Sequence, residues 1–224
     1  ETKNISKLYK QADQEIRALD NVTINFKQGE FTAIVGPSGS GKTTFLNSIG
    51  GLDSPTKGQV LIDNKDITKL NSNQLIDFRL TNIGFVFQSY NLIPVLTAKE
   101  NVEFIMLMQG ASKSKRDKRA LELLEAVGLK EQLNRRPNQL SGGQQQRVAV
   151  ARALASKPKF ILADEPTANL DSSSTANLLD IMSRLNEEER MTFIFSTHDQ
   201  RVIDRANRII TLEDGKILSD INVK

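Results

Sequence analysis

The sequence has no cysteine among its 224 residues and only one histidine. Without cysteine, the chain can form no disulfide, no thiolate metal site and no cysteine nucleophile. Long apolar runs are missing too: runs such as residues 104–108 are far shorter than the roughly 20 residues that a membrane-spanning helix needs. No signal-peptide pattern or internal repeat is visible either. We therefore expect a cytoplasmic protein whose role at any membrane comes through another chain.

A strong excess of one charge is also absent. Lysine and arginine number 30 against 27 aspartates and glutamates, which gives a formal net charge of +3. This balance does not require a nucleic-acid partner, and we expect none. The densest basic stretch, residues 113–119, is more typical of a solvated helix face than of a dedicated site for an anionic partner. With 38% hydrophobic and 25% charged residues, the composition is that of an ordinary folded protein with a sizeable core.

Short apolar runs alternate with amphipathic stretches, which favours an α/β fold. Strands are expected at residues 16–26, 31–35, 59–62, 83–87, 160–163, 192–196 and 209–212. Helices are expected at residues 41–49, within 97–127, at 141–155 behind an N-cap serine, and at 172–185. The pattern predicts a mostly parallel core interrupted by a helical insert over about residues 89–155. An antiparallel β portion is expected in the first 85 residues.

A glycine-rich segment that fits G-x-x-x-x-G-K-[ST] lies between a predicted strand and a predicted helix. Its glycines permit positive φ and let successive amides point at phosphate oxygens, and the helix adds its positive dipole end. We expect Lys42 to reach the β- and γ-phosphates and Thr43 to ligate Mg²⁺. A mere glycine- and serine-rich turn is the alternative, but the fixed positions recur by chance in only about 1% of chains of this length. The expected nucleotide-binding residues are Gly36, Pro37, Ser38, Gly39, Ser40, Gly41, Lys42, Thr43 and Thr44.

Two acids, Asp164 and Glu165, end the apolar run at 160–163. In an open parallel sheet, ligands collect outside the carboxyl ends of the strands, where the phosphate loop also lies. We expect Asp164 to hold Mg²⁺ through a water, and Glu165 to orient or deprotonate an attacking water. The alternative is a strand that simply exits into a polar turn, which the phosphate loop makes less favoured.

The segment Leu140-Ser141-Gly142-Gly143-Gln144 is the signature sequence of ATP-binding cassette (ABC) ATPases. With it, the chain resembles that family over essentially its full length, because the other family motifs follow in order. Gln88 resembles the Q-loop glutamine, residues 168–171 the D-loop, and His198 the switch histidine. Tyr9 lies 27 residues before Gly36, where the family keeps an aromatic that stacks on adenine. Taken singly, Tyr9 could be an edge-strand aromatic, Gln88 a surface amide and His198 a surface histidine.

The resemblance implies a P-loop NTPase (RecA-like) fold: a mostly parallel α/β core, an antiparallel β subdomain and an inserted α-helical subdomain. Residues 1–224 would form one ABC ATPase domain, with residues 1–88 and 156–224 in the core and β subdomain and 89–155 in the insert. The implied ligands are ATP and Mg²⁺. The implied catalytic residues are Glu165, His198, Gln88 and Lys42, and the implied metal ligands are Thr43, Gln88 and Asp164. Asn169 departs from the family, which often has a small residue there.

Two glycine-rich helix tips, at residues 36–43 and 141–144, are both anion sites by their amides and dipoles. One lies in the core and one in the insert, so both cannot easily grip one nucleotide within a single chain. The resemblance implies a head-to-tail dimer, a homodimer in our expectation, with two ATP molecules at its interface. Each would lie between one chain's phosphate loop and residues of the other chain, namely Ser141, Gly142, Gly143, Gln144 and Asp171.

Residues 84–98 and 137–147 resemble the branch of macrolide exporters, lipoprotein-releasing and antimicrobial-peptide-resistance transporters. This branch implies a cytoplasmic ATPase that sits on the inner face of the membrane through a separate permease chain. It would power a membrane transporter or a mechanotransmission complex, for export or extraction of peptides, lipids, lipoproteins or drugs. The expected docking contacts are Leu92, Ile93, Val95 and Leu96, unless these residues are buried in the insert. Two alternatives are a soluble ABC ATPase that acts on nucleic acid or macromolecular assembly, and a small-molecule phosphotransferase.

Overall fold

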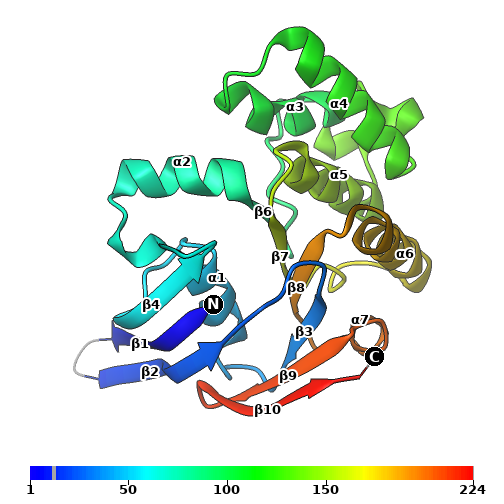
Figure 1. Cartoon of the computed structure of the whole chain (residues 1–224). Coiled ribbons are helices and arrows are strands. Elements are labelled where there is room, and N and C mark those ends of the chain that lie inside the picture. Colours follow the sequence, from blue (N-terminus) through cyan, green and yellow to red (C-terminus); the bar gives the residue numbers. More distant parts are fainter. Residues whose placement is uncertain (12–13, 224) are drawn as a thin grey trace.

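The computed structural model, which describes residues 1–11 and 14–223, is built around a six-stranded sheet (Figure 1). Its strands are Phe31–Val35 (β3), Ile83–Val86 (β6), Phe160–Asp164 (β7), Thr192–Ser196 (β8), Arg208–Glu213 (β9) and Lys216–Asn222 (β10). Across the sheet the order is β10-β9-β3-β8-β7-β6. Strands β9, β3, β8, β7 and β6 run parallel to one another, and β10 is antiparallel to β9. The predicted mostly parallel core is confirmed.

The central strands are buried on both faces, which explains their continuous apolar sequences. On one face, Ile34, Leu162 and Ile194 pack against helix α1, Lys42–Ile49. On the other face, the alternate residues, such as Ile161 and Phe195, pack in the cluster that contains the two long helices Gly142–Ala155 (α5) and Ser172–Glu189 (α6). Every parallel strand therefore ends at one edge of a sheet that helices cover on both faces.

A second sheet lies within the first 85 residues, as expected, and is antiparallel. It contains Gln14–Ile24 (β2), Thr2–Gln11 (β1), Lys57–Ile62 (β4) and Lys65–Asp66 (β5), in the order β2-β1-β4-β5. A short 3₁₀ turn, Ile67–Lys69 (η1), and helix Ser72–Asn82 (α2) follow it. The sequence reasoning did not predict β1, β5, α2 or β10.

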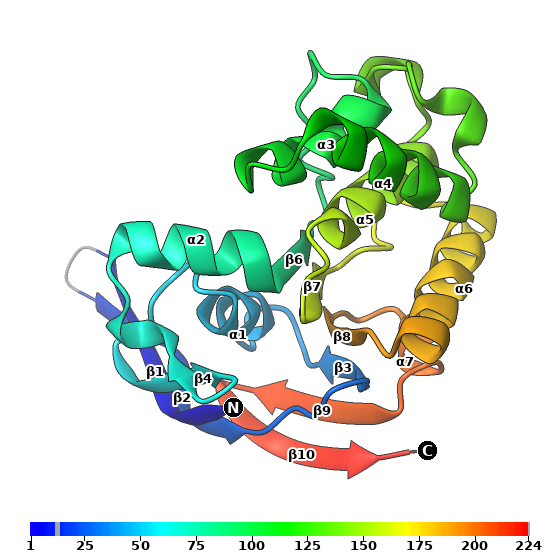
Figure 2. The same ribbon diagram turned by 45° about the horizontal axis from the view of Figure 1, so that its top comes forward.

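The stretch predicted as helical over 97–127 is two helices, Ala98–Met108 (α3) and Lys113–Ala126 (α4). They separate at Gly110, whose φ of +74° ends the helical path. Two 3₁₀ turns, Lys130–Gln132 (η2) and Pro137–Gln139 (η3), lead into α5, and Gln200–Ile203 (α7) precedes β9. Figure 2 shows α3 and α4 beside α5, at the end of the molecule away from β1, β2 and β4.

Helix α5 joins the helical layer to the sheet. It packs with α3 and α4 and also against β6. The approach to β6 is so close that a Cβ on Gly84 would lie 2.6 Å from the carbonyl oxygen of Ala153. Since α5 contacts both layers, the boundaries of the insert at 89 and 155 stay a prediction. No helix in the described part of the chain combines the length and apolar character needed to cross a membrane.

Candidate functional site

The glycine-rich segment 36–43 connects β3 to α1, as predicted, at the carboxyl edge of the parallel strands. Gly36 has a φ of +150°, and a Cβ there would lie 2.0 Å from the carbonyl oxygen of Leu212. Gly41 has a φ of +102°, and its Cβ would lie 2.3 Å from the carbonyl oxygen of Ala18. Only glycine fits these two positions, because both the backbone conformation and the neighbouring backbone exclude a side chain.

Helix α1 begins at Lys42, with Gly41 as its N-cap. The Lys42 ammonium folds back over the segment and donates hydrogen bonds to the carbonyl oxygens of Gly36 at 2.8 Å and Pro37 at 2.9 Å. A positive charge and the free amides of a helix N-terminus thus converge on one concave loop. This combination suits a phosphate group.

Thr43 and Asp164 meet across the gap between α1 and β7. The Thr43 hydroxyl donates to Oδ1 of Asp164 at 3.1 Å. A hydroxyl and a carboxylate are the oxygen ligands that Mg²⁺ prefers, and Mg²⁺ commonly completes its octahedron with phosphate and water. No cluster of three or more His, Cys, Asp or Glu residues able to hold a metal occurs within residues 1–11 and 14–223. Thr43 and Asp164 thus offer two oxygen ligands side by side.

Glu165 and His198 form a second pair at the same edge. Nδ1 of His198 lies 2.8 Å from Oε1 of Glu165, whose side chain is 16% exposed. The backbone amide of Glu165 donates to the carbonyl oxygen of Ser196 at 2.8 Å, which fixes the end of β7 to the end of β8. Glu165 has a φ of +44°, in the left-handed region that few non-glycine residues adopt. Its Oε2 is buried and has no hydrogen-bond partner in the described part of the chain.

Asp199, which directly follows His198 in the sequence, holds the loop that carries this histidine. Arg201 donates to both carboxylate oxygens of Asp199, and the Thr167 hydroxyl donates to Oδ2 at 2.8 Å. The hydrogen bonds from Arg201, helped by Thr167, lower the pKa of Asp199 to about 2. Sequence reasoning assigned no role to Asp199. Its position next to His198 was the available signal.

Tyr9 on β1 lies beside the first turn of α1. Its hydroxyl donates to Oδ2 of Asp53 at 2.6 Å, and Lys7 forms an ion pair with the same carboxylate. Burial, reinforced by Asp53, raises the pKa of Tyr9, while a side-chain hydrogen bond with Thr44 acts in the opposite direction. Lys7 Nζ lies 5.1 Å from the centre of the ring, and Tyr9 is 38% exposed. Sequence reasoning missed Lys7 and Asp53, which hold the ring.

The second glycine-rich tip is the N-terminus of α5. Ser141 is the N-cap: its hydroxyl accepts from the amide of Gln144, and the Gln144 side chain accepts from the Ser141 amide. A Cβ on Gly142 would lie 2.8 Å from the Tyr90 hydroxyl, and one on Gly143 would lie 2.6 Å from the Ser174 hydroxyl. In the described part of the chain, no hydrogen bond or ion pair joins residues 141–144 to residues 36–43.

Gln88 follows β6, and Asp171 directly precedes α6. The Gln88 residue is exposed, and its carbonyl oxygen accepts from the Asn169 amide at 3.1 Å. Asp171 caps α6, because its two carboxylate oxygens accept from the amide and the hydroxyl of Ser174. The hydrogen bonds from Ser174 lower the pKa of Asp171. One chain thus brings residues 36–44, 164, 165 and 198 together, and places 141–144 on another element.

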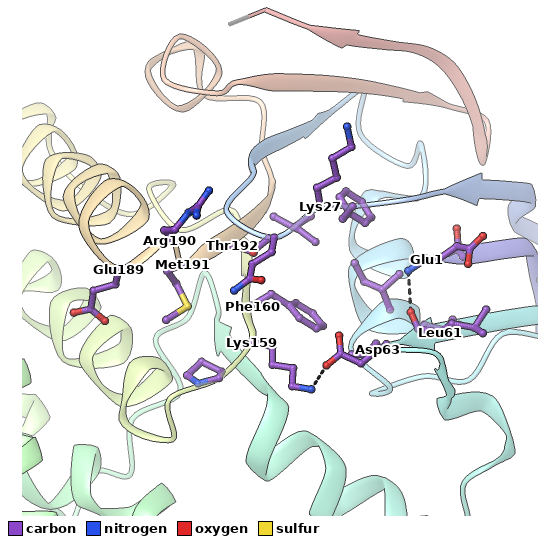
Figure 3. Close-up of a pocket in the computed structure, with 18 residues that line it drawn as sticks. Glu1, Lys27, Leu61, Asp63, Lys159, Phe160, Glu189, Arg190, Met191 and Thr192 are labelled. Atoms are coloured by element: carbon purple, nitrogen blue, oxygen red, sulfur yellow. Dashed lines mark hydrogen bonds and ion pairs between the residues drawn. The ribbon is translucent and has the colours of Figure 1, made fainter.

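A cavity of about 430 Å³ opens at the opposite edge of the large sheet, where β7 and β8 begin (Figure 3). Phe160 and Thr192 line it, and an ion pair between Lys159 and Asp63 lies at its side. None of the residues assigned above to phosphate or hydrolysis lines this cavity. This cavity is therefore not the candidate functional site, which lies at the carboxyl edge of the parallel strands.

Comparisons with known proteins agree with the motifs. The model of the ABC transporter family matches residues 19–168. An uncharacterized ABC transporter ATP-binding protein, MJ0796, of Methanocaldococcus jannaschii is 52% identical over 96% of this chain and 93% of its own length. The macrolide export ATP-binding/permease protein MacB of Hyphomonas neptunium is 47% identical over 98% of this chain, but only 34% of its own length is covered. A solved structure described as a dimeric post-hydrolysis state of the MJ0796 cassette with ADP and Pi superposes with a TM-score of 0.93, at 48% identity, over 100% of this chain and 98% of that one.

Proposed function

Because this chain belongs to the ABC transporter family, we propose that it is an ATPase subunit that dimerises around two ATP molecules and powers a separate membrane permease. It binds and hydrolyses ATP, in keeping with its similarity to the MJ0796 cassette bound to ADP and Pi. The assignments to individual residues and the permease partner are our inferences from this family membership and from the geometry of the site.

One observation carries the proposal. The hydrolytic pair Glu165 and His198 lies at the same edge of the sheet as the phosphate loop, whereas the tip of α5 is a second anion site on another element. An anion site that its own chain does not complete suits the nucleotide of a second copy. The dimeric cassettes of MJ0796 show that a closely similar chain associates in pairs.

The chemistry is shared between the residues of one site. Lys42 and the amides of residues 36–43 bind the phosphates, and the ring of Tyr9 offers a stacking face for the adenine. Glu165 accepts a proton from the attacking water, and its contact with His198 fixes the orientation of the carboxylate. Thr43 and Asp164, with Gln88, would hold Mg²⁺, which neutralises charge on the phosphates when bound.

The permease partner is inferred from relatives that carry both parts in one chain. This chain covers about a third of the MacB protein, whose name includes a permease. A permease on a second chain would then place the cassette at the inner face of the membrane, for export or extraction of peptides, lipids, lipoproteins or drugs.

The docking surface is proposed near Val95. Of the four apolar residues expected there, Leu92 packs against the helical core, whereas Val95 is 70% exposed. The segment is shaped by buried Asn101, whose side chain accepts from the Ile93 amide at 2.8 Å and donates to the Leu96 carbonyl oxygen at 3.1 Å. We propose that this turn contacts the permease through Val95.

The dimer is tested by sedimentation of the Glu165→Gln variant with ATP in the absence of Mg²⁺. Slowed hydrolysis keeps the γ-phosphate in place, so we expect a dimer with ATP and a monomer with ADP. Ser141→Arg, which places a bulky cation at the exposed tip of α5, should remain monomeric with ATP. Persistent monomers of the Glu165→Gln variant under every nucleotide condition would contradict the proposal.

A further inference from the structure

Gln146 is a fully buried amide on α5, less than two turns after Ser141. Its Nε2 donates to the carbonyl oxygen of Pro166 at 2.7 Å and lies 3.5 Å from the carbonyl oxygen of Phe87. Pro166 directly follows Glu165, and Phe87 directly precedes Gln88. One side chain therefore touches the two segments that carry residues assigned to hydrolysis.

The segment 87–91 depends on such contacts for its conformation. Tyr90 and Asn91 are successive residues in the left-handed region, with φ of +58° and +49°. Arg152, also on α5, donates to the carbonyl oxygen of Tyr90 at 2.8 Å and to that of Asn91. Asn169 donates to the carbonyl oxygen of Gln88 at 3.1 Å. The backbone of this loop is thus placed by side chains from other elements, and α5 supplies two of them.

We propose that Gln146 is a positioning residue that ties Glu165 and Gln88 of one chain to the signature tip of the same chain's α5. The inference rests on the proposed dimer, in which the tip at Ser141 faces the nucleotide bound by the partner's phosphate loop. In this dimer, the tip of α5 contacts the ATP bound by the partner's phosphate loop. Gln146 on the same helix contacts the segments of its own chain that carry Glu165 and Gln88. A nucleotide in the first site sets the position of the hydrolytic residues in the second, so the two sites act cooperatively.

The first test replaces the donor with a side chain of similar length, Gln146→Met. We expect kcat to fall about 10-fold and the Hill coefficient for ATP to fall toward 1. The KM and the affinity of the monomer for a fluorescent ATP analogue should stay within about twofold of wild type, because the phosphate loop is untouched. Wild-type kcat together with a wild-type Hill coefficient would overturn the proposal.

The matched control is Gln145→Met, one residue earlier on the same helix. Gln145 donates to the carbonyl oxygen of Leu140 at 3.1 Å, so the control also loses one side-chain to backbone hydrogen bond. Within the described part of the chain, Gln145 makes no side-chain hydrogen bond to Phe87 or Pro166, and we expect wild-type kinetics. A second variant, Gln146→Leu, has a side chain of similar size that cannot donate at any pH. It should lose at least as much kcat as Gln146→Met, and wild-type kcat in it would refute a role for the donor.

Hydrogen exchange of the nucleotide-free chain separates this inference from the dimer on which it rests. In Gln146→Met, amides in residues 87–91 and 167–170 should exchange about 10-fold faster, while Gln145→Met should match the wild type. Unchanged exchange in both segments of a folded Gln146→Met chain would overturn the tie. A wild-type chain that never dimerises or hydrolyses no ATP would instead refute the proposed function.

Discussion

Glu165 is held in a strained backbone conformation, with a φ of +44°. Such a conformation costs about 1–3 kcal/mol and persists only where its surroundings determine it. Here the surroundings are the hydrogen bond from its amide to Ser196 and the contact of its Oε1 with His198. The Glu165–His198 contact lies at the carboxyl edge of the strands, as the phosphate loop does. A position fixed in this way suits a base that must meet one water in one direction.

The variant Glu165→Gln should bind ATP normally and hydrolyse it about 10²–10⁴-fold more slowly, because an amide cannot accept the proton. Phosphate release at saturating ATP measures the rate. Glu213→Gln, at an exposed acid on β9, is the matched control and should keep the wild-type rate. A normal rate in Glu165→Gln would show that another residue is the base.

Lys42 provides a second prediction. Removing its ammonium in Lys42→Ala should weaken ATP binding about 10- to 100-fold, since hydrogen bonds to charged groups are worth about 1.5–3 kcal/mol. Titration with a fluorescent ATP analogue measures the dissociation constant. Lys57→Ala removes an exposed lysine on β4 and should bind as wild type does. Equal affinities for all three proteins would contradict the assignment of Lys42.

At the scale of elements, the loop after β8 is tied to the loop after β7 by Asp199. Asp199 also caps α7, because its carboxylate accepts from the Arg201 amide at 3.0 Å. The lowered pKa of Asp199, about 2, means that folding favours the ionised carboxylate. This stabilisation is complete above about pH 4 and is lost as the pH falls through about 2.

We therefore expect Asp199→Asn to lower the free energy of unfolding at pH 7 by about 1–2 kcal/mol, a value reduced for solvent screening of the partly exposed Arg201. The difference between variant and wild type should narrow between pH 4 and pH 2. Urea unfolding at several pH values measures it, with the exposed Asp77→Asn as a control. A difference that does not change with pH would show that the ion pair is not its source.

Elements with a continuous apolar run or a clear cap were predictable from the sequence. The strand Phe31–Val35 and the serine cap of α5 are confirmed at the expected residues. Strand β1 was not predicted, because the register of its pairing with β2 shifts and Asn4 has a φ of +50°. Both features break the alternation of buried residues. Helix α2 buries none of its side chains fully and so has no apolar stripe. Strand β10 lies at the sheet edge with an exposed Leu218.

The residues of the candidate site were likewise predictable only in part. Contiguous motifs named Lys42, Glu165 and His198, and the structure brings their segments to one edge of the sheet. Whether these residues perform the assigned steps stays a prediction. The contacts made by Asp199 and Gln146 join residues 20 to 60 positions apart, and no local pattern marks such pairs. Only the folded chain reveals them.

At the scale of the whole molecule, the docking surface can be separated from the ATPase. Val95→Glu places a charge on the exposed turn before α3, so we expect loss of permease binding with unchanged basal ATP hydrolysis. The measurement is co-purification from solubilised membranes, with the captured chain identified as a membrane-spanning protein by mass spectrometry. Leu218→Glu, at a similarly exposed residue on β10, should retain the partner. Retention by Val95→Glu would move the docking surface elsewhere.

The contact between Gly84 and Ala153 has a mechanical consequence. A hypothetical Cβ at residue 84 would lie only 2.6 Å from the Ala153 carbonyl oxygen, so any side chain there would push α5 away from β6 at that point. Ser141 lies about 18 Å along the helix from this contact, at about 1.5 Å per residue. A rotation of α5 by about 10° about this contact would therefore move Ser141 by about 3 Å, roughly the donor–acceptor distance of a hydrogen bond.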